Sequence, residues 1–386
     1  MKRSSDRILT THVGSLARPP EVLEMMAARA KGEAYDAAEF ERRVTKAVND
    51  SVKKQVECGI DVVADGEQSK DSFYAYVRSR LAGFEPMERG PLSSRPWSKE
   101  LSTFKDYYDN YYFAGRAGGR IGADLTLVCT GPISYVGHAE LQADIARVKA
   151  AAAAAGANDV FMPATAPQGL GRNEYYKTEE EFQFALADAM HEEYKAIVDA
   201  GIVVQVDDPA LTSFFAREDS TREQQHRYAE VYVDAINQAL KGIPSDMVRF
   251  HTCYGINEGP RIFDIPLREI IGLMLKINAD ALSFEFGNPQ HEHEYHVFED
   301  VRLAPGKVLI PGIISHTTNV VEHPEVVAER ILNFVNLVGP EAVIAGADCG
   351  FSSQATYKPD IHPDIVWTKF RSLSEGAEIA SKKLRK

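Results

Sequence analysis

The sequence has little cysteine, no long apolar run and no cluster of basic residues. Only 4 cysteines occur in 386 residues, so a disulfide framework is not expected and a reducing compartment is the simpler expectation. The N-terminal segment lacks the apolar core of a signal peptide, and no stretch approaches the length of a membrane span. We therefore expect a cytoplasmic protein.

The charge balance excludes some partners. The formal net charge is −13, and such a surface repels nucleic acid and anionic membranes unless a basic patch intervenes. With 44% hydrophobic and 26% charged residues, the composition is that of an ordinary globular protein with a sizeable core. We expect small-molecule partners, no nucleic acid and no membrane, with a homo-oligomer left open.

Short β-branched runs alternate with longer helical patterns, which is typical of parallel βα units. No Gly-rich phosphate fingerprint follows the first run, and this favours a (β/α)₈ barrel over a dinucleotide-binding sheet. We expect residues 1–386 to form one such domain. An eight-stranded barrel needs one run fewer than the nine present, so we expect either 160–167 or the first run to be accessory. The runs are 10–15, 61–67, 125–132, 160–167, 203–209, 248–255, 282–287, 308–314 and 343–350.

The helical patterns are each long enough to cross back over a strand. They cover 36–57, 139–155, 178–200, 221–241, 266–278 and 324–337. Residues 85–120 interrupt the rhythm with Pro, Ser, Trp97 and an aromatic group at 107–113, which indicates a long insertion. In a barrel enzyme such an insertion forms a lid or one wall of the substrate pocket. Aromatic packing of the insertion onto the barrel is the alternative.

Four potential metal ligands fall where three of the predicted strands end. His251 and Cys253 lie in VRFHTCYG, Glu285 in LSFEFG and Cys349 in VIAGADCG. Zn²⁺ takes four N, S or O ligands of these types, and their distribution over distant strands indicates a site assembled by the whole fold. Each residue alone would be read as a core histidine, a buried thiol or a stray acid. The His-rich segment 288–300 is read as a solvated loop rather than a second metal site.

Other polar residues also end predicted strands, and the carboxyl ends of barrel strands share one face. They are Gly14, Ser15, Asp65, Glu67, Asp207, Asp208 and His316. Zinc with two thiolates, an imidazole and a carboxylate has a formal charge of about −1, which is unsuited to splitting water and suited to activating a thiol. The pattern therefore predicts alkyl transfer to sulfur, with His316 or Asp208 managing the proton that the departing group requires.

The runs TTHVGSLARP, DVVADGE, TGPIS, VDDPA, HTCYG, SFEFG and DCGF, in this order, resemble the catalytic barrel of the cobalamin-independent methionine synthase family. The resemblance covers essentially the whole chain. It implies a zinc site of His251, Cys253, Glu285 and Cys349, and methyl transfer to homocysteine.

The same resemblance implies that Gly14 and Ser15, Glu67 and Asp207 hold homocysteine. Backbone N–H groups with a hydroxyl suit its carboxylate, and carboxylates suit its ammonium. The family's folate-binding loop is replaced by RAGGRIG at 116–122, where only Arg116 and Arg120 are basic. The methyl donor, a methylated folate or a simpler one, is left open.

Three other functions are compatible with parts of the sequence. Single-barrel relatives that carry a segment similar to HTTNVVEHPE include the epoxyalkane:coenzyme M transferases, which add a zinc-bound thiolate to an epoxide. A sulfonate would need a cation near the pocket, whereas Glu67 and Asp207 would repel it, so homocysteine is preferred. A noncatalytic metal-binding protein is the alternative of another class. A porphyrin decarboxylase is disfavoured because too few arginines lie at these strand ends.

Overall fold

Eight parallel strands form the centre of the protein. The computed structural model describes residues 1–88, 98–112, 121, 125–168, 170–217, 219–255 and 259–385. A parallel bridge between Thr11 and Val62 joins the first and last strands of the sheet, so the barrel closes. The (β/α)₈ prediction is confirmed. In barrel order the strands are β1 (Leu9–Thr10), β2 (Val62–Val63), β5 (Asp159–Thr165), β7 (Val203–Asp208), β8 (Val248–Thr252), β9 (Ala281–Phe284), β10 (Val308–Ile314) and β11 (Ile344–Ala347).

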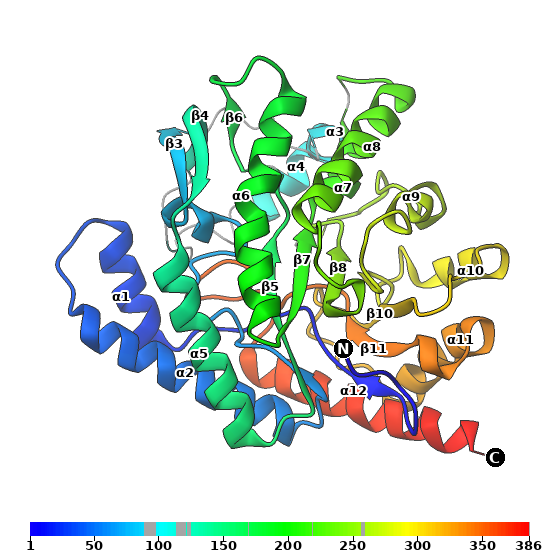
Figure 1. Ribbon diagram of the computed structural model, residues 1–386. Coiled ribbons are helices and arrows are strands. Elements are labelled where there is room, and N and C mark those ends of the chain that lie inside the picture. The colour runs from blue at the N-terminus through cyan, green and yellow to red at the C-terminus, as the bar shows by residue number, and fades with distance from the viewer. Residues whose placement is uncertain are drawn as a thin grey trace.

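Helices cross back between these strands and cover the barrel (Figure 1). The six predicted helices are present, each within a few residues of its expected limits. Their first residues explain where they start: Thr221 and Gln224 form a capping box, and Asp36 and Thr178 accept N–H bonds from the first turn. The helices are α1 (Pro20–Ala30), α2 (Ala37–Glu57), α5 (His138–Ala155), α6 (Glu179–Asp199), α8 (Arg222–Ala239), α9 (Leu267–Met274), α10 (Val297–Asp300), α11 (Pro324–Val338) and α12 (Pro363–Leu384).

The accessory strand is not the one expected. Both 160–167 and the first run contribute barrel strands, whereas 125–132 lies in β4 (Leu125–Tyr135) of a separate sheet. There β4 pairs antiparallel with β3 (Leu81–Glu88) and parallel with β6 (Arg172–Asn173). Along β4, residues 130, 132 and 134 are exposed while 131 and 133 are half-buried, an alternation typical of a ribbon with one solvent-facing side. The β-branched residues of this run suit either kind of sheet, which is why the sequence did not separate them.

The insertion leaves the barrel after β2. Within it the structure describes β3, the short helices α3 (Ser98–Thr103) and α4 (Lys105–Tyr107), and a π-helical turn at Tyr108–Tyr112. Figure 1 shows α3, α4 and the β3–β4–β6 sheet at one end of the barrel, with α12 and the C-terminus at the other. Trp97, Phe113, Arg116 and Arg120 lie outside the described residues. The assignment of 85–120 as a lid stays a prediction.

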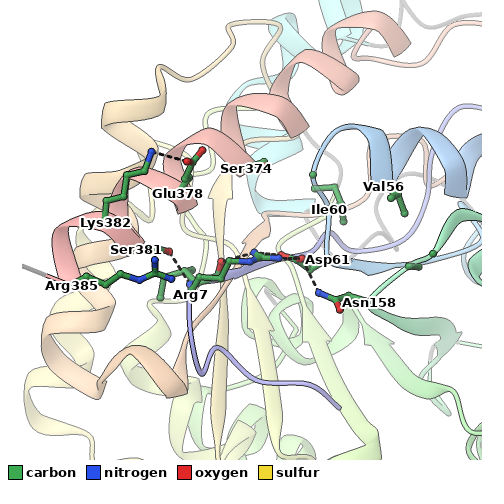
Figure 2. Close-up of a pocket in the computed structure, with 14 residues that line it drawn as sticks. Arg7, Val56, Ile60, Asp61, Asn158, Ser374, Glu378, Ser381, Lys382 and Arg385 are labelled. Carbon is green, nitrogen blue, oxygen red and sulfur yellow. Dashed lines mark hydrogen bonds and ion pairs between the residues drawn. The ribbon is translucent and has the colours of Figure 1, made fainter.

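A pocket of about 480 Å³ lies at the end of the barrel where strands begin (Figure 2). Segments that precede β1, β2 and β5 line it together with α12. Four of its charges are paired, because Arg7 binds Asp61 and Lys382 lies 2.6 Å from Glu378, while Arg385 donates to the carbonyl of Asp6. Among the described residues, no helix is both long and apolar enough to cross a membrane.

A buried carboxylate ties the accessory sheet to the barrel helices. Glu193 of α6 accepts hydrogen bonds from the hydroxyls of Tyr76 and Tyr135, each at 2.6 Å. The guanidinium of Arg80 lies 3.4 Å from the same carboxylate, and all of these side chains are buried. A charge held in this way stabilises the fold only while its partners are in place.

We expect Glu193→Ala to lower the free energy of unfolding by about 3–5 kcal/mol, because it leaves the buried Arg80 with one carboxylate fewer and two tyrosine hydroxyls without an acceptor. Urea unfolding followed by circular dichroism measures the change. Glu192→Ala is the control: this neighbour is 49% exposed, and its loss should cost about 0.5 kcal/mol or less. Equal effects of the two substitutions would contradict the assignment.

Candidate functional site

The predicted site residues meet at the carboxyl end of the barrel. His251 lies in β8, with Cys253 just beyond it, while Glu285 follows β9 and Cys349 follows β11. Every predicted site residue is buried: Gly14, Ser15, Glu67, Asp207, Asp208, His251, Cys253, Glu285, His316 and Cys349. Parallel strands that end at one face bring them together, as the sequence predicted.

Three of the four predicted ligands form one compact group. A ring nitrogen of His251 and the sulfurs of Cys253 and Cys349 lie within 4.8 Å of one another. Tetrahedral zinc with Zn–N and Zn–S bonds of about 2.0–2.3 Å would place its ligand atoms roughly 3.3–3.8 Å apart. A small contraction of this group would therefore enclose a metal ion.

The histidine of this group is oriented to bind. Its Nδ1 lies 3.1 Å from the hydroxyl of Ser283, while the buried Nε2 has no hydrogen-bond partner. Burial lowers the pKa of His251 to about 3, so the ring is neutral and keeps a lone pair. The hydrogen bond with Cys253 and burial raise the pKa of the Cys349 thiol, an effect that a bound cation would reverse.

Glu285 lies beside this group but belongs to a second cluster with His316 and Asp348, whose ligand atoms are also within 4.8 Å of one another. Asp348 fixes the loop after β9 by accepting backbone N–H bonds from Phe286 at 2.7 Å and Gly287 at 2.6 Å. Burial raises the pKa of Asp348 to about 7, and the charge of Glu285 adds to this shift.

A second group of buried carboxylates, Glu67 and Asp207, lies at the carboxyl ends of β2 and β7. Burial raises the pKa of Glu67, and it raises that of Asp207 well above its usual range, to which the charge of Glu67 also contributes. The buried Oε2 of Glu67 has no hydrogen bond, and its nearest cation is Arg18 at 3.9 Å. Lys70 is also close, but its ammonium donates to the carbonyl of Pro163 at 2.6 Å. An ammonium ligand would satisfy these acids.

Gly14 and Ser15 form the wall next to Glu67. Gly14 has φ +134°, and a Cβ there would lie 2.5 Å from the ring of Pro163 and 3.3 Å from Glu67, so only glycine fits. Its N–H donates to Nδ1 of the buried His12 at 3.2 Å. The hydroxyl of Ser15 lies 3.3 Å from that of Ser353. The backbone at Gly14 therefore lies close to the carboxylate of Glu67.

Two groups could transfer protons. Asp208 accepts N–H bonds from Ala210 and Leu211 through one oxygen, while its other oxygen has no partner; burial raises its pKa to about 7. Burial lowers the pKa of His316 to about 4, although Glu285 and the carbonyl of Gly255 favour its protonated form. A group with a pKa near 7 exchanges protons readily at neutral pH.

The sequence analysis missed a chain of buried charges behind Glu285. Arg261 lies 2.8 Å from Glu285 and 2.9 Å from Asp264, and His291 lies 3.2 Å from Asp264 and 2.8 Å from Glu294. These hydrogen bonds outweigh burial and raise the pKa of His291 to about 9. The interpretation of 288–300 as a solvated loop is therefore wrong for His291, because its side chain is buried between Asp264 and Glu294. No spacing in the sequence signals these partners.

Comparison with known proteins identifies the family of the chain. The sequence profile of the cobalamin-independent synthase catalytic domain matches residues 8–99 and 163–359. The chain belongs to this family. A methionine synthase of Sulfolobus acidocaldarius is 25% identical over 347 residues, covering 88% of this chain and 85% of that protein. One from Saccharolobus islandicus is 24% identical, covering 98% and 96%.

The fold of the family is also shared. The structure of a B12-independent methionine synthase from Shewanella sp. W3-18-1 in complex with selenomethionine superposes with a TM-score of 0.70 at 20% identity, covering 98% of this chain and 99% of that one. The family profile leaves residues 100–162 unmatched. That interval contains α4, β4, α5 and most of α3, and also the RAGGRIG segment. The profile therefore does not cover most of the insertion after residue 99 or the barrel helix α5.

The raised pKa of Asp208 predicts how stability changes with pH. Because the folded pKa is about 7 and the unfolded value about 3.8, the folded state holds an extra proton between these values. The contribution of Asp208 to stability is thus lost as pH rises from about 4 to 7. Asp208→Asn removes that loss, so the variant should gain stability relative to the wild type across this range, by about 1.4 kcal/mol per pH unit at most.

Urea unfolding of both proteins at several pH values gives the difference in free energy of unfolding. Comparing the two proteins cancels the other buried acids, whose titration is common to both. A difference that stays constant between pH 4 and 7 would show that Asp208 is ionised throughout and that its pKa is not raised.

Proposed function

We propose that this protein is a zinc-dependent thiol S-methyltransferase whose acceptor is homocysteine. The observation that supports this most is the buried group of His251, Cys253 and Cys349 at the barrel mouth, within the matched family interval. Its donors suit a borderline-soft ion, and a site open to substrate needs only three protein ligands. The relatives are methionine synthases. We treat residues 1–386 as one domain.

The residues fit zinc on their own chemistry. The partnerless Nε2 of His251 and two adjacent sulfurs provide a ligand set of one imidazole and two thiolates, with Glu285 alongside as a fourth candidate. When bound, zinc would lower the pKa of a substrate thiol into the neutral range while leaving its sulfur nucleophilic. The protein would shield the ion from bulk water, because every candidate ligand is buried.

The chain would hold homocysteine by its amino-acid end. In this proposal Glu67 and Asp207 bind the ammonium, and the backbone and hydroxyl of Gly14 and Ser15 bind the carboxylate. Burial raises the pKa of both carboxyl groups because their charged forms lack a close cation. An ammonium bound between them would stabilise the charged form of each. Binding at two points fixes the thiol end toward Cys253 and Cys349, which converts a bimolecular reaction into an oriented one.

Methyl transfer to sulfur breaks the bond between the methyl carbon and the donor, and the donor atom takes the electron pair. That atom then needs a proton. Asp208, with a pKa of about 7, and His316, beside Glu285, are the candidates to deliver it. The donor is a methylated folate or a simpler compound, and its binding surface would include the insertion that the family profile leaves unmatched.

Addition of a thiol such as coenzyme M to an epoxide is the second candidate function. It is favoured by the buried guanidinium groups of Arg18 and Arg261 near the two acid clusters, since a sulfonate needs such cations. Each of these arginines already faces a carboxylate, however. An amino-acid thiol remains the better fit to Glu67 and Asp207.

The direct test is an assay for methionine. Purified zinc-loaded protein with homocysteine and a methylated folate, or a simple methyl donor, should form methionine, detected by mass spectrometry. Replacing homocysteine by coenzyme M and the methyl donor by an epoxide tests the second function. Thioether formed only in the latter mixture would overturn the proposed acceptor.

We expect Cys349→Ser to lose zinc and to reduce methyl transfer by about 100-fold or more, because a hydroxyl is a far weaker zinc ligand than a thiolate. Metal analysis and turnover measure both effects. The melting temperature should change little, since a barrel of this size does not depend on zinc to fold. Cys58→Ser is the control: this buried thiol lies at the end of α2, outside the cluster. A large fall in melting temperature with turnover retained would indicate a structural metal.

We expect Glu67→Gln to raise the KM for homocysteine by about 10-fold to 100-fold, because a charge-assisted hydrogen bond to the ammonium is worth roughly 1.5–3 kcal/mol. The KM for 4-mercaptobutyrate, which lacks the amine, should stay within about 3-fold of the wild-type value. Steady-state kinetics with both thiols separates the two. If both values rise together, Glu67 supports the fold of the pocket rather than the amine.

A further inference from the structure

One side-chain amide joins two parts of the barrel mouth that the proposed function uses together. Gln205 lies in β7 two residues before Asp207, and alternate residues of a strand point to the same face. Its Nε2 donates to the carboxylate of Asp207 at 2.8 Å and to the carbonyl of Val13 at 2.5 Å. Val13 directly precedes Gly14 and Ser15. The amide therefore connects the acid proposed for the ammonium to the segment proposed for the carboxylate.

The orientation of this amide is fixed by what it faces. Gln205 is fully buried, and both of its partner atoms are acceptors. Turned over, the amide would place its own oxygen against a carbonyl and a carboxylate, so the NH₂ group must face them. Among the described residues its Oε1 has no hydrogen-bond partner. A buried oxygen without a donor costs stability, which favours a role for this residue in the site.

The segment that Gln205 holds lies beyond the regular sheet. Strand pairing of β1 ends before His12, and the chain then turns at Gly14, where φ is +134°. The carbonyl of His12 accepts from Nη2 of Arg249 at 2.9 Å, as that of Val13 accepts from Gln205. The two donors are paired positions of β7 and β8, which lie across the barrel from β1. Side chains that cross the barrel interior thus support this backbone.

The hydrogen bond from Gln205 also favours the charged form of Asp207. Burial, with the charge of Glu67, raises the pKa of Asp207 well above its usual range, and the bond from Gln205 acts against that rise. The charged carboxylate is the form that binds an ammonium. Because the same amide is bonded to Val13, Asp207 is held at a set distance from the carboxylate-binding segment.

We propose that Gln205 is a positioning residue that sets the spacing between the two ends of the homocysteine site. The ammonium and carboxylate of an α-amino acid are attached to one carbon, so the protein groups that bind them must match a fixed separation. This rests on the proposed function and adds to it a residue that selects an α-amino-acid thiol over thiols with only one of the two groups. Gln205 acts through Asp207 and Val13.

Three thiols of equal chain length test this. They are homocysteine, 4-mercaptobutyrate, which lacks the amine, and 3-aminopropane-1-thiol, which lacks the carboxylate. Calorimetric titration of the zinc-loaded wild type and Gln205→Met gives the dissociation constants. We expect Gln205→Met to weaken homocysteine binding by about 10-fold or more, because the two ends lose their common support. Binding of each one-ended thiol should weaken by about 3-fold or less, since it can shift to fit the end that it uses.

Gln225→Met is the matched control. This buried glutamine of α8 donates to the carbonyls of Arg217 and Ser220, outside the candidate site, and its loss should leave all three dissociation constants within about 2-fold. Melting temperatures show whether each variant folds. If Gln205→Met does not fold, Gln205→Asn serves in its place. It keeps a buried amide but is one methylene shorter, so it cannot reach both acceptors and should give the same pattern.

Three results would overturn the proposal. Homocysteine binding that weakens by less than about 3-fold would show that the amide is not needed. An equal loss for homocysteine and 3-aminopropane-1-thiol would assign the effect to the charge of Asp207 alone, and an equal loss for all three thiols would assign it to a distorted pocket. Wild-type protein that binds homocysteine no more tightly than 4-mercaptobutyrate would instead overturn the proposed acceptor, and this inference with it.

Discussion

The free-energy cost of burying charged groups determines how the side chains at the carboxyl end of this barrel are paired. Eight parallel strands bring their carboxyl ends to one face, and six acids there are buried. Each acid must find a donor or stay protonated. Asp348 takes two backbone N–H groups and Glu285 takes an arginine, whereas Glu67 and Asp208 each keep an oxygen without a partner. The acids are Asp65, Glu67, Asp207, Asp208, Glu285 and Asp348.

The acids at this face therefore fall into two groups, those with hydrogen-bond donors for their oxygens and those without. Acids that the protein satisfies fully serve to hold loops, as Asp348 does for the turn after β9. Acids that it leaves unsatisfied are the ones a substrate can satisfy, and Glu67, whose buried Oε2 has no hydrogen-bond partner, is of this kind. The same rule applies to His251, whose free Nε2 marks where a metal would bind. At this end of the barrel, buried polar atoms without a partner are therefore the candidate contacts for a ligand.

Much of this could be predicted from the sequence, because the rule that parallel strand ends converge needs only the strands to be recognised. His251, Cys253 and Cys349 were found in this way, and the structure places them together. The accessory strand was not found, since the β-branched run at 125–132 suits a ribbon as well as a barrel. Arg261 and His291 were missed for another reason. Their partners come from separate loops, and only the folded chain brings these together.

The intervals matched by the family profile contain the candidate site residues, whereas most of the insertion lies outside them. The matched intervals contain every candidate ligand and every proposed homocysteine contact, while the unmatched interval 100–162 contains α4, β4 and most of α3 together with the barrel helix α5. Lys99 of α3 lies over the ring of Phe263, 4.7 Å from its centroid, so the insertion contacts the loop that carries Arg261. Under the proposed function, the barrel would activate the thiol and the insertion would contribute to binding the methyl donor.

Proton release on thiol binding tests the central claim most directly. A thiol with a pKa of about 8.5 is largely protonated at pH 7, so deprotonation in the site must release a proton to solvent. Calorimetric titration of zinc-loaded protein with homocysteine, in buffers of different ionisation enthalpy, counts these protons. We predict about one proton per homocysteine bound with zinc present and about none without it. Binding without proton release from the zinc-loaded protein would contradict thiol activation.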